Sequence, residues 1–397
     1  MTHVEPDLER GALDPAAEDA LARLRERIDV TVPIEEPYLR FANPDSIAHV
    51  ARGLGDANPL YLDPGYARRS RYGALVAPPA WLYGAAWGSW DLRRGQYVPG
   101  LTALHSGDHW QFVRPVLDGD CIRASKALVR LAPLGKAGGP LRILQSEQIR
   151  FVNQREELVA IQVMSTIRVA RAGSGPAGHY AGAVKASYSA DQIAAIDDSL
   201  LREAPRGAEP RYWEDVAVGD PLEPVLKGPL TATDMIAWIQ AIGSPHVRTG
   251  RHWLDCREQY PGVSAPDTHG IPQPLERVHW DEGHARTEGG LPSAFDYGAQ
   301  RGGYATYFAT LWAGDDGWVC DLDVQYRGMV FYGDVFRITG EVTGTWRGPH
   351  GTGFVRAAIK AVNDRRENVM PGTVTFALPS RQTGPVRFPV ETAEDLR

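Results

Sequence analysis

A histidine in the second half of the chain has acidic residues close to it. His279 lies three residues after Glu276 and two residues before Asp281. A histidine side chain titrates within the physiological pH range, so this segment has the residue types that general acid–base catalysis needs. Asp296 stands two residues before Gly298, where a helix is predicted to begin. His279 and Asp296 are therefore candidates for proton transfer, and a helix N-terminus can bind an anion.

A second group of polar residues lies in the first half. Asp56 and Asn58 precede Tyr61 in the segment GLGDANPLYLDPGYA. Asp and Asn side chains in loops also bond their own backbone, so a structural role for Asp56 and Asn58 is an open alternative. The alternative role of Asp281 and Asp296 is to cap the helix-like runs that follow them.

The elements that would position these residues occur twice along the chain. Two segments share the pattern Q-[FY]-x-x-x-V-x-x-G-D-x-x-R at an offset of 214, and two further pairs recur at offsets of 210 and 188. Three offsets in the same order indicate a duplicated unit. The pairs are 111–123 with 325–337, 152–154 with 362–364, and 45–55 with 233–243.

Each unit is predicted to contain two helices followed by antiparallel strands, which makes it α+β. The first helix of each unit has apolar residues at three-and-four spacing, and a second, central helix covers 77–90 or 297–312. The predicted strands are 106–116, 121–131, 141–153 and 159–169, then 320–331, 335–346, 354–363 and 369–378.

These elements give a predicted division of the chain. An N-terminal extension covers 1–24, with a short helix over 14–28. The first unit covers 25–172, a linker with one helix covers 173–209, and the second unit covers 210–397.

Composition excludes several classes of protein. The chain has 397 residues, a formal net charge of −7 and no basic run, which argues against nucleic acid and anionic membranes as partners. No apolar run reaches the ~18 residues of a membrane span, and the start carries no secretory signal. Cys121, Cys256 and Cys320 form no metal or disulfide pattern, so a reducing cytoplasm is the expected location. The histidine spacings fit no metal motif, so no metal site is expected.

The segment 53–67, followed by APPAW (77–81), resembles the MaoC-like acyl dehydratases and (R)-specific enoyl-CoA hydratases. Their signature is close to G-D-x-N-P-L-H-x-D-P-x-x-A. In the second half, VHWDEGHAR (278–286) and FDYGAQR (295–301) resemble the same superfamily. The resemblance implies a tandem, or double, hotdog fold. In that fold two long central helices are wrapped by one continuous antiparallel sheet.

The resemblance also implies which unit is active. In that family an Asp and a His five residues apart move protons, and an N–H at the start of the central helix holds the thioester oxygen. The first unit has Tyr61 at the His position and starts its helix with Pro78-Pro79, which lacks N–H groups. The second unit keeps His279, but Pro274 stands where the Asp is expected. An insertion of about 30 residues fills this loop.

The resulting prediction is a hydratase/dehydratase of 3-hydroxyacyl and trans-2-enoyl thioesters with one active site. His279 would transfer protons, Asp296 would position or activate water, and Gly298 would bind the oxyanion. Glu276, Asp281, Asp56, Asn58 and Tyr61 are secondary candidates. No redox cofactor or metal is expected, and CoA or a carrier-bound pantetheine is the substrate handle. A homodimer, or a hetero-oligomer with another hotdog chain, is expected.

Two alternatives stay open at the level of sequence. The first is a non-catalytic acyl-binding or partner subunit, which the missing Asp and Tyr61 favour. The second is a hotdog thioesterase or natural-product dehydratase. Acyl length, CoA against carrier, and the residues that bind the CoA phosphates are not encoded in any recognisable pattern.

Overall fold

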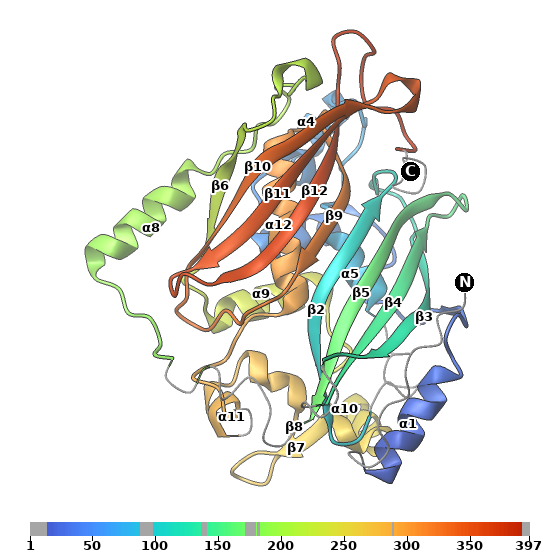
Figure 1. Cartoon of the computed structure of the whole chain (residues 1–397), viewed down its shortest axis with the longest axis vertical. Helices are drawn as coiled ribbons and strands as arrows, with labels where there is room; N and C mark the ends of the chain where they lie inside the picture. Colours follow the sequence, from blue (N-terminus) through green and yellow to red (C-terminus); the bar gives the residue numbers. More distant parts are fainter. Residues whose placement is uncertain are drawn as a thin grey trace.

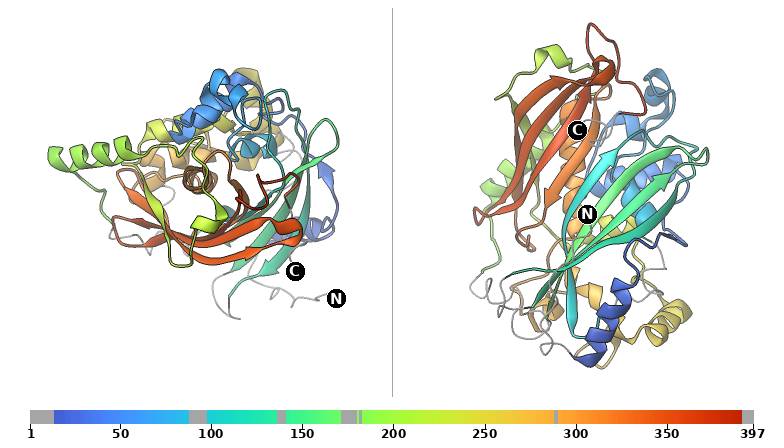
Figure 2. Two further views of the ribbon diagram at one scale, coloured as in Figure 1. Left: turned by 90° about the horizontal axis from the view of Figure 1, so that it is seen from above. Right: turned by 45° about the vertical axis from the view of Figure 1, so that its right-hand side comes forward.

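The computed structural model describes residues 14–87, 98–135, 141–170, 180, 183–287 and 290–390. This part of the chain forms one ten-stranded antiparallel sheet that curves around helices on its concave side (Figures 1 and 2). None of the helices described is long and apolar enough to cross a membrane. The three cysteines are all free.

The strand order of the sheet is β1-β3-β4-β5-β2-β9-β12-β11-β10-β6. The strands form because buried and exposed residues alternate, as along β11, where Ala357 and Ile359 are buried between exposed neighbours. The strands are β1 (Val32–Pro33), β2 (Leu101–Phe112), β3 (Arg123–Pro133), β4 (Arg142–Val152), β5 (Leu158–Ala170), β6 (Pro221–Lys227), β9 (Trp318–Gln325), β10 (Phe336–Arg347), β11 (Gly353–Asn363) and β12 (Asn368–Leu378).

The two predicted units meet at the β2–β9 pair, in the middle of the sheet. Gly107 pairs with Gln325, and Gln111 pairs with Asp321. Gln111 and Gln325 are repeat partners, and so, at the same offset of 214, are Gly107 and Asp321. At this seam, the β2–β9 pair, the two units are related by a local two-fold axis, as expected of a duplicated unit. The continuous sheet predicted from the resemblance is confirmed.

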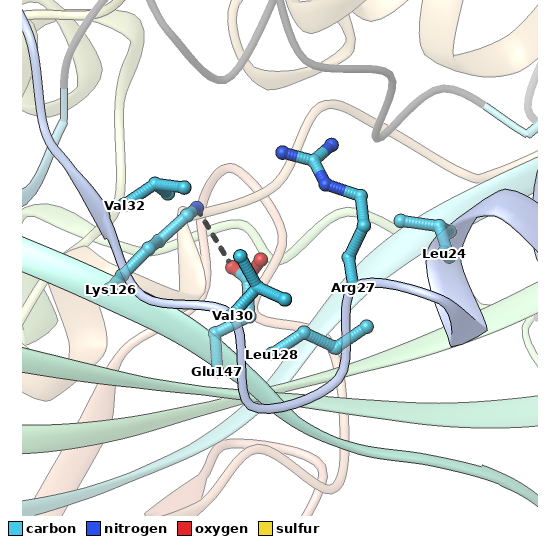
Figure 3. Close-up of a pocket in the computed structure, with 7 residues that line it drawn as sticks. All are labelled: Leu24, Arg27, Val30, Val32, Lys126, Leu128 and Glu147. Carbon is cyan, nitrogen blue, oxygen red and sulfur yellow. Dashed lines mark hydrogen bonds and ion pairs between the residues drawn. The ribbon is translucent and has the colours of Figure 1, made fainter.

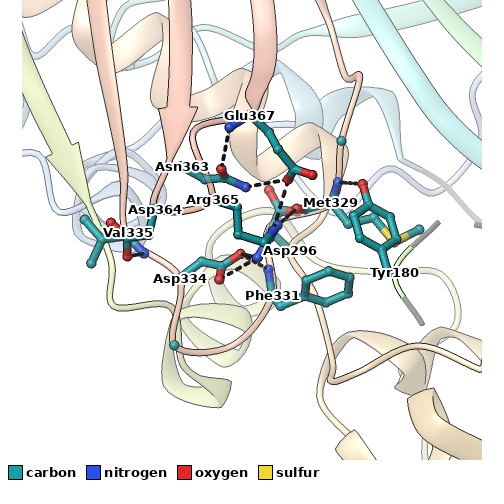
Figure 4. A network of polar contacts seen from close by, with 12 residues as sticks. Tyr180, Asp296, Met329, Phe331, Asp334, Val335, Asn363, Asp364, Arg365 and Glu367 are labelled. Carbon is teal, nitrogen blue, oxygen red and sulfur yellow. Dashed lines mark hydrogen bonds and ion pairs between the residues drawn. The ribbon is translucent and has the colours of Figure 1, made fainter. Parts of the chain in front are cut away.

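A network of one arginine and two carboxylates occurs at equivalent positions in the two units. In the second unit Arg365 binds both oxygens of Asp334 at 2.8 and 2.6 Å and reaches Glu367 (Figure 4). In the first unit Arg155 lies 3.4 Å from Asp120 and bonds Glu157. These contacts hold the Gly-Asp turn of each repeat against the hairpin that follows.

The helices on the concave side pack across the same seam. Helices α2 (Pro44–Leu54) and α9 (Ala232–Ile242) lie against each other, and a Cβ on Gly53 would come within 2.6 Å of the Ala241 Cβ. The long central helix α12 (Gly298–Ala313) is buried along most of its length and contacts β2, β6, β9 and β12. A 16-residue helix here agrees with the predicted central helix of the second unit.

The central helix of the first unit is shorter than predicted. α5 covers only Trp81–Ala86, and residues 88–90 of the predicted helix lie outside the described residues. Pro78 and Pro79 cannot supply helical N–H donors, so the regular helix begins after them. The remaining helices are α1 (Pro15–Arg25), α3 (Pro59–Leu62), α4 (Pro64–Arg69), α8 (Ala190–Arg202), α10 (Gly250–Gln259), α11 (Glu282–Thr287), η1 (Trp213–Asp215), η2 (Pro261–Val263), η3 (Leu275–His279) and η4 (Pro349–Gly351).

The insertion in the second unit contains α10, η2 and a small hairpin of β7 (Ser264–Pro266) and β8 (Pro272–Pro274). Most strands differ from their predicted bounds by one or two residues, and two differ by more. β2 begins five residues earlier than predicted, at Leu101, and β9 ends at Gln325 instead of continuing to residue 331. β6 was not among the predicted strands, and it pairs with β10 at the edge of the sheet.

A small pocket lies between the N-terminal segment and the outer strands of the first unit (Figure 3). Lys126 and Glu147 form a buried ion pair of 2.9 Å there, beside Leu24 and Val32. These residues lie on β1, β3, β4 and the segment around α1, so this pocket belongs to the outer strands of the first unit and not to the His279 loop.

Candidate active site

His279 is the last residue of η3, and only one of its two ring nitrogens is hydrogen-bonded to a described residue. Its Nδ1 lies 3.0 Å from the carbonyl oxygen of Phe295, so Nδ1 carries the proton that is donated to this carbonyl. The ring stacks on Tyr297 with centroids 3.9 Å apart. Among the described residues no atom bonds Nε2, which is therefore an unprotonated acceptor.

Burial keeps the His279 imidazole neutral near pH 7. Burial lowers the pKa of His279 below its ordinary value because it disfavours the charged ring. The carboxylates of Glu276 and Asp296 act in the opposite direction but do not outweigh burial. A neutral imidazole with a bare nitrogen is suited to accept a proton.

Glu276 lies beside His279 and is bound by two hydroxyl groups. The Tyr297 hydroxyl donates to Glu276 Oε1 at 2.7 Å, and the Ser244 hydroxyl donates to Oε2 at 2.5 Å. Each carboxylate oxygen thus already accepts one strong hydrogen bond. The geometry places Glu276 in the site and favours a role in orienting Tyr297, against which the His279 ring stacks.

The N-terminus of α12 faces the same segment. Its N-cap residue, Tyr297, makes no side-chain cap, and no described residue accepts the N–H groups of Gly298, Ala299 and Gln300. Such unpaired N–H groups and the positive end of the helix dipole stabilise an anion. Gly298, the predicted oxyanion position, is half-buried.

Asp296 lies next to this helix start but is bound to a cation. Arg301 donates to both of its oxygens, at 2.8 and 2.6 Å, and the two side chains are at most 3% exposed. Arg301 also donates to the carbonyl oxygens of Gly328 and Val369. This geometry favours a structural ion pair, although Asp296 does lie at the predicted site. Asp296 does not cap α12 through its side chain, because the N-cap residue is Tyr297.

Asp281 occupies the capping position that was the alternative to a catalytic role. Its Oδ1 accepts the backbone N–H of His284 at 3.0 Å, at the start of α11. Its side chain is 43% exposed and lies 3.9 Å from Arg277. The structure places Asp281 at the helix start, outside the contacts that hold the His279 ring.

The corresponding loop of the first unit is filled by protein side chains. Asp56 Oδ1 accepts the N–H of Asn58 at 2.9 Å, and Asn58 donates to Asp315 at 3.3 Å. Tyr61 is buried beside them, and burial raises its pKa well above the ordinary value. Burial also raises the pKa of Asp56, to about 6.

The first three N–H groups of the central helix in the first unit, α5, are already paired. The N–H groups of Trp81, Leu82 and Tyr83 donate to the carbonyl oxygens of Pro78, Pro79 and Ala80. An oxyanion would find no unpaired N–H among these three residues. The first-unit loop therefore differs from the start of α12, where the first N–H groups have no partner among the described residues.

Comparisons with known proteins agree with this architecture. The model of the FAS1-like dehydratase domain region matches residues 42–162. A MaoC-like dehydratase superposes with a TM-score of 0.63, at 18% identity over 89% of this chain and 99% of its own. A Mycobacterium tuberculosis protein described as having a double hotdog fold superposes at 0.50, with 16% identity over 85% and 93%.

The chain shares the double hotdog fold of these solved structures, and the dehydratase model matches about a third of its length. A MaoC domain protein from Chloroflexus aurantiacus also superposes, at a TM-score of 0.54 and 15% identity over 89% of this chain and 96% of that one. A UPF0336 protein from Parafrankia sp. is 30% identical over 95 residues. The match covers 23% of this chain and 63% of that relative.

One pair of residues near the start of α12 was not predicted from the sequence. His105 and Asp108 on β2 form a 3.0 Å ion pair whose imidazole lies against the first turn of α12. The predicted strand begins at residue 106 and does not include His105. The available signal was a histidine three residues before a buried Asp, and only the pairing of β2 brings that histidine to Gly298.

Proposed function

We propose that the chain is a hydratase/dehydratase that acts reversibly on 3-hydroxyacyl and trans-2-enoyl thioesters. The observation that carries the proposal is the bare Nε2 of His279 beside the uncapped N-terminus of α12. The dehydratase region matched in the first unit supports the same class of reaction.

The chemistry needs these two features. Addition of water to the double bond builds negative charge on the thioester oxygen, which the N–H groups of Gly298, Ala299 and Gln300 would stabilise. His279 Nε2 would accept a proton from the attacking water, because its neutral form dominates near pH 7. In the reverse direction the imidazolium would protonate the leaving hydroxyl group.

The reaction as written needs no redox cofactor and no metal ion. CoA or a carrier-bound pantetheine would provide the handle of the substrate. Association with a second hotdog chain, either a copy or a different one, is part of the same proposal. Acyl length remains to be found by measurement.

The test is hydration of trans-2-enoyl-CoA thioesters of increasing chain length, followed by loss of the enoyl absorbance. We expect turnover by the natural sequence and a loss of about 10²–10⁴-fold in the His279→Gln variant, as for other general bases. The matched control is His269→Gln, because His269 is exposed in the β7–β8 hairpin. Equal rates for the natural protein and His279→Gln would refute the assignment.

A second candidate is a non-catalytic acyl-binding subunit. It is favoured by Pro274 at the expected acid position and by the Arg301 ion pair that occupies Asp296. Calorimetric titration with crotonyl-CoA separates the two candidates. Binding without hydration supports the subunit, while release of free CoA would indicate a thioesterase instead.

A further inference from the structure

We propose that His105, oriented by Asp108, is the second proton-transfer residue of this site and exchanges the proton on the α-carbon of the acyl thioester. The inference rests on the function proposed above, and goes beyond it by naming a catalytic residue from the first unit. In this role His105 takes the place of the motif Asp, where this chain has Pro274.

A β-bulge turns His105 toward the helices. In a regular strand residues three apart point to opposite faces, but the β2–β5 register shifts between His105 and Gly107. His105 and Asp108 therefore reach the same concave side. Gly107 permits the shift, since a Cβ there would lie 2.7 Å from the Val324 carbonyl oxygen across the seam.

Asp108 is buried, and its hydrogen bonds stabilise the charged carboxylate. It is 2% exposed and accepts hydrogen bonds from Tyr83 and Tyr326 at 2.7 Å each, and from Gln162 at 2.8 Å. Burial alone would raise its pKa, but His105 and the two tyrosines outweigh burial and lower the pKa below the ordinary value.

The carboxylate fixes the ring of His105 in one orientation. His105 Nε2 lies 3.0 Å from Asp108 Oδ1, so Nε2–H donates to the carboxylate. The Tyr326 ring packs edge-on against the imidazole at 5.0 Å. No described residue bonds Nδ1, which is therefore the nitrogen available for proton transfer, and the side chain as a whole is 17% exposed.

The open nitrogen lies at the helix start. A Cβ built on Gly298 would lie 3.1 Å from His105 Nδ1 and 3.0 Å from its Cβ. A thioester oxygen bound by the first N–H groups of α12 is two bonds from the α-carbon. A group beside Gly298 is therefore within reach of that carbon, whereas His279 approaches α12 through Tyr297.

The other acidic candidates near this point are already bound. Both oxygens of Glu276 accept hydroxyl protons, and both oxygens of Asp296 accept from Arg301. His105 has an unbonded nitrogen and a fixed partner, as a proton-transfer residue needs.

The step balances with two histidines. In hydration, water forms a C–O bond to the β-carbon and gives one proton to His279 Nε2, while the π electron pair moves onto the thioester as an enolate. The His105 imidazolium then gives its Nδ1 proton to the α-carbon as the enolate collapses. One water is added, and the proton gained by His279 returns to His105 through solvent.

The experiment compares two histidines of β2 that are each paired with an aspartate. His109 pairs with Asp321 at 2.8 Å but is 39% exposed, so His109→Gln is the matched control for His105→Gln. In the enoyl-CoA hydration assay we expect His105→Gln to lose about 10²–10⁴-fold in kcat with KM within about threefold. We expect His109→Gln to keep the natural rate. Circular dichroism and thermal unfolding check that each variant is folded.

Two further measurements keep the assignment open to refutation if His105→Gln folds poorly. Added imidazole should restore turnover to His105→Ala but not to His279→Gln, because only the former leaves a ring-sized space beside Gly298. Asp108→Asn, a change in a positioning residue, should alter the pH profile of kcat while KM is kept.

The outcomes separate this inference from the proposed function. Full activity in His105→Gln, with activity lost in His279→Gln, would overturn the role of His105 alone. Absence of turnover and of enoyl-CoA binding in the natural protein would overturn the proposed function and, with it, this role. Loss in His105→Gln with rescue of His105→Ala by imidazole supports the assignment.

Discussion

Replacement of Asp296 by Asn separates an ion-pair role from a catalytic one. The change keeps the shape of the side chain and removes the charge that faces Arg301, in a pair that is at most 3% exposed. Removing one partner of a buried pair costs about 3–5 kcal/mol, because the other charge stays buried. Arg301 keeps its bonds to Gly328 and Val369, and the new amide oxygen still accepts one bond. We therefore expect a loss near the lower limit, about 3 kcal/mol.

The assay is equilibrium unfolding in urea, with hydration activity measured on the same samples below the transition. Asp281→Asn is the matched control, since Asn caps a helix almost as well as Asp, and its stability should change by less than about 0.5 kcal/mol. An Asp296→Asn variant of natural stability that loses activity about 10²-fold or more would refute the structural role. Such a result would return Asp296 to the catalytic role predicted from its place before Gly298.

Three further predictions concern charge and space in the two loops. Burial lowers the pKa of His279, and its neutral form is the base. On the acid side of a pH–rate profile, kcat/KM should therefore fall only once the pH drops below 6.5, the ordinary pKa of histidine. The folded-state pKa of Asp56 is raised from 3.8 to about 6, so its contribution to stability is complete below pH 3.8 and is lost as the pH rises through 6. Asp56→Asn should then stabilise the protein by up to about 3 kcal/mol at pH 8 and little at pH 4 in urea unfolding, and equal effects at both would contradict this. Gly298→Ala should displace His105 and lower kcat at least about tenfold, whereas an unchanged kcat would argue that the helix start is not used.

Local pattern was enough to find most of the elements. The helices at 45–55 and 233–243 appear as α2 and α9, because each has an apolar face, and α9 has a Thr–Asp capping box. The helix predicted in the linker appears as α8, with Ser189 as its cap. The bounds of β2 were wrong because residues 101–105 do not alternate regularly, and the strand is formed there by pairing with β5.

The sequence by itself determined the duplicated α+β units, the family resemblance and the place of His279, since each depends on residues close together in the chain. The tertiary structure decided which side chains meet. Asp296 forms an ion pair with Arg301 because both residues lie where α12 crosses the segments around Gly328 and Val369. His105 reaches Gly298 because a bulge turns it inward at the seam of the two units, almost 200 residues away in sequence. Such contacts depend on strand pairing between distant segments, and hydrophobic periodicity carries no information about them.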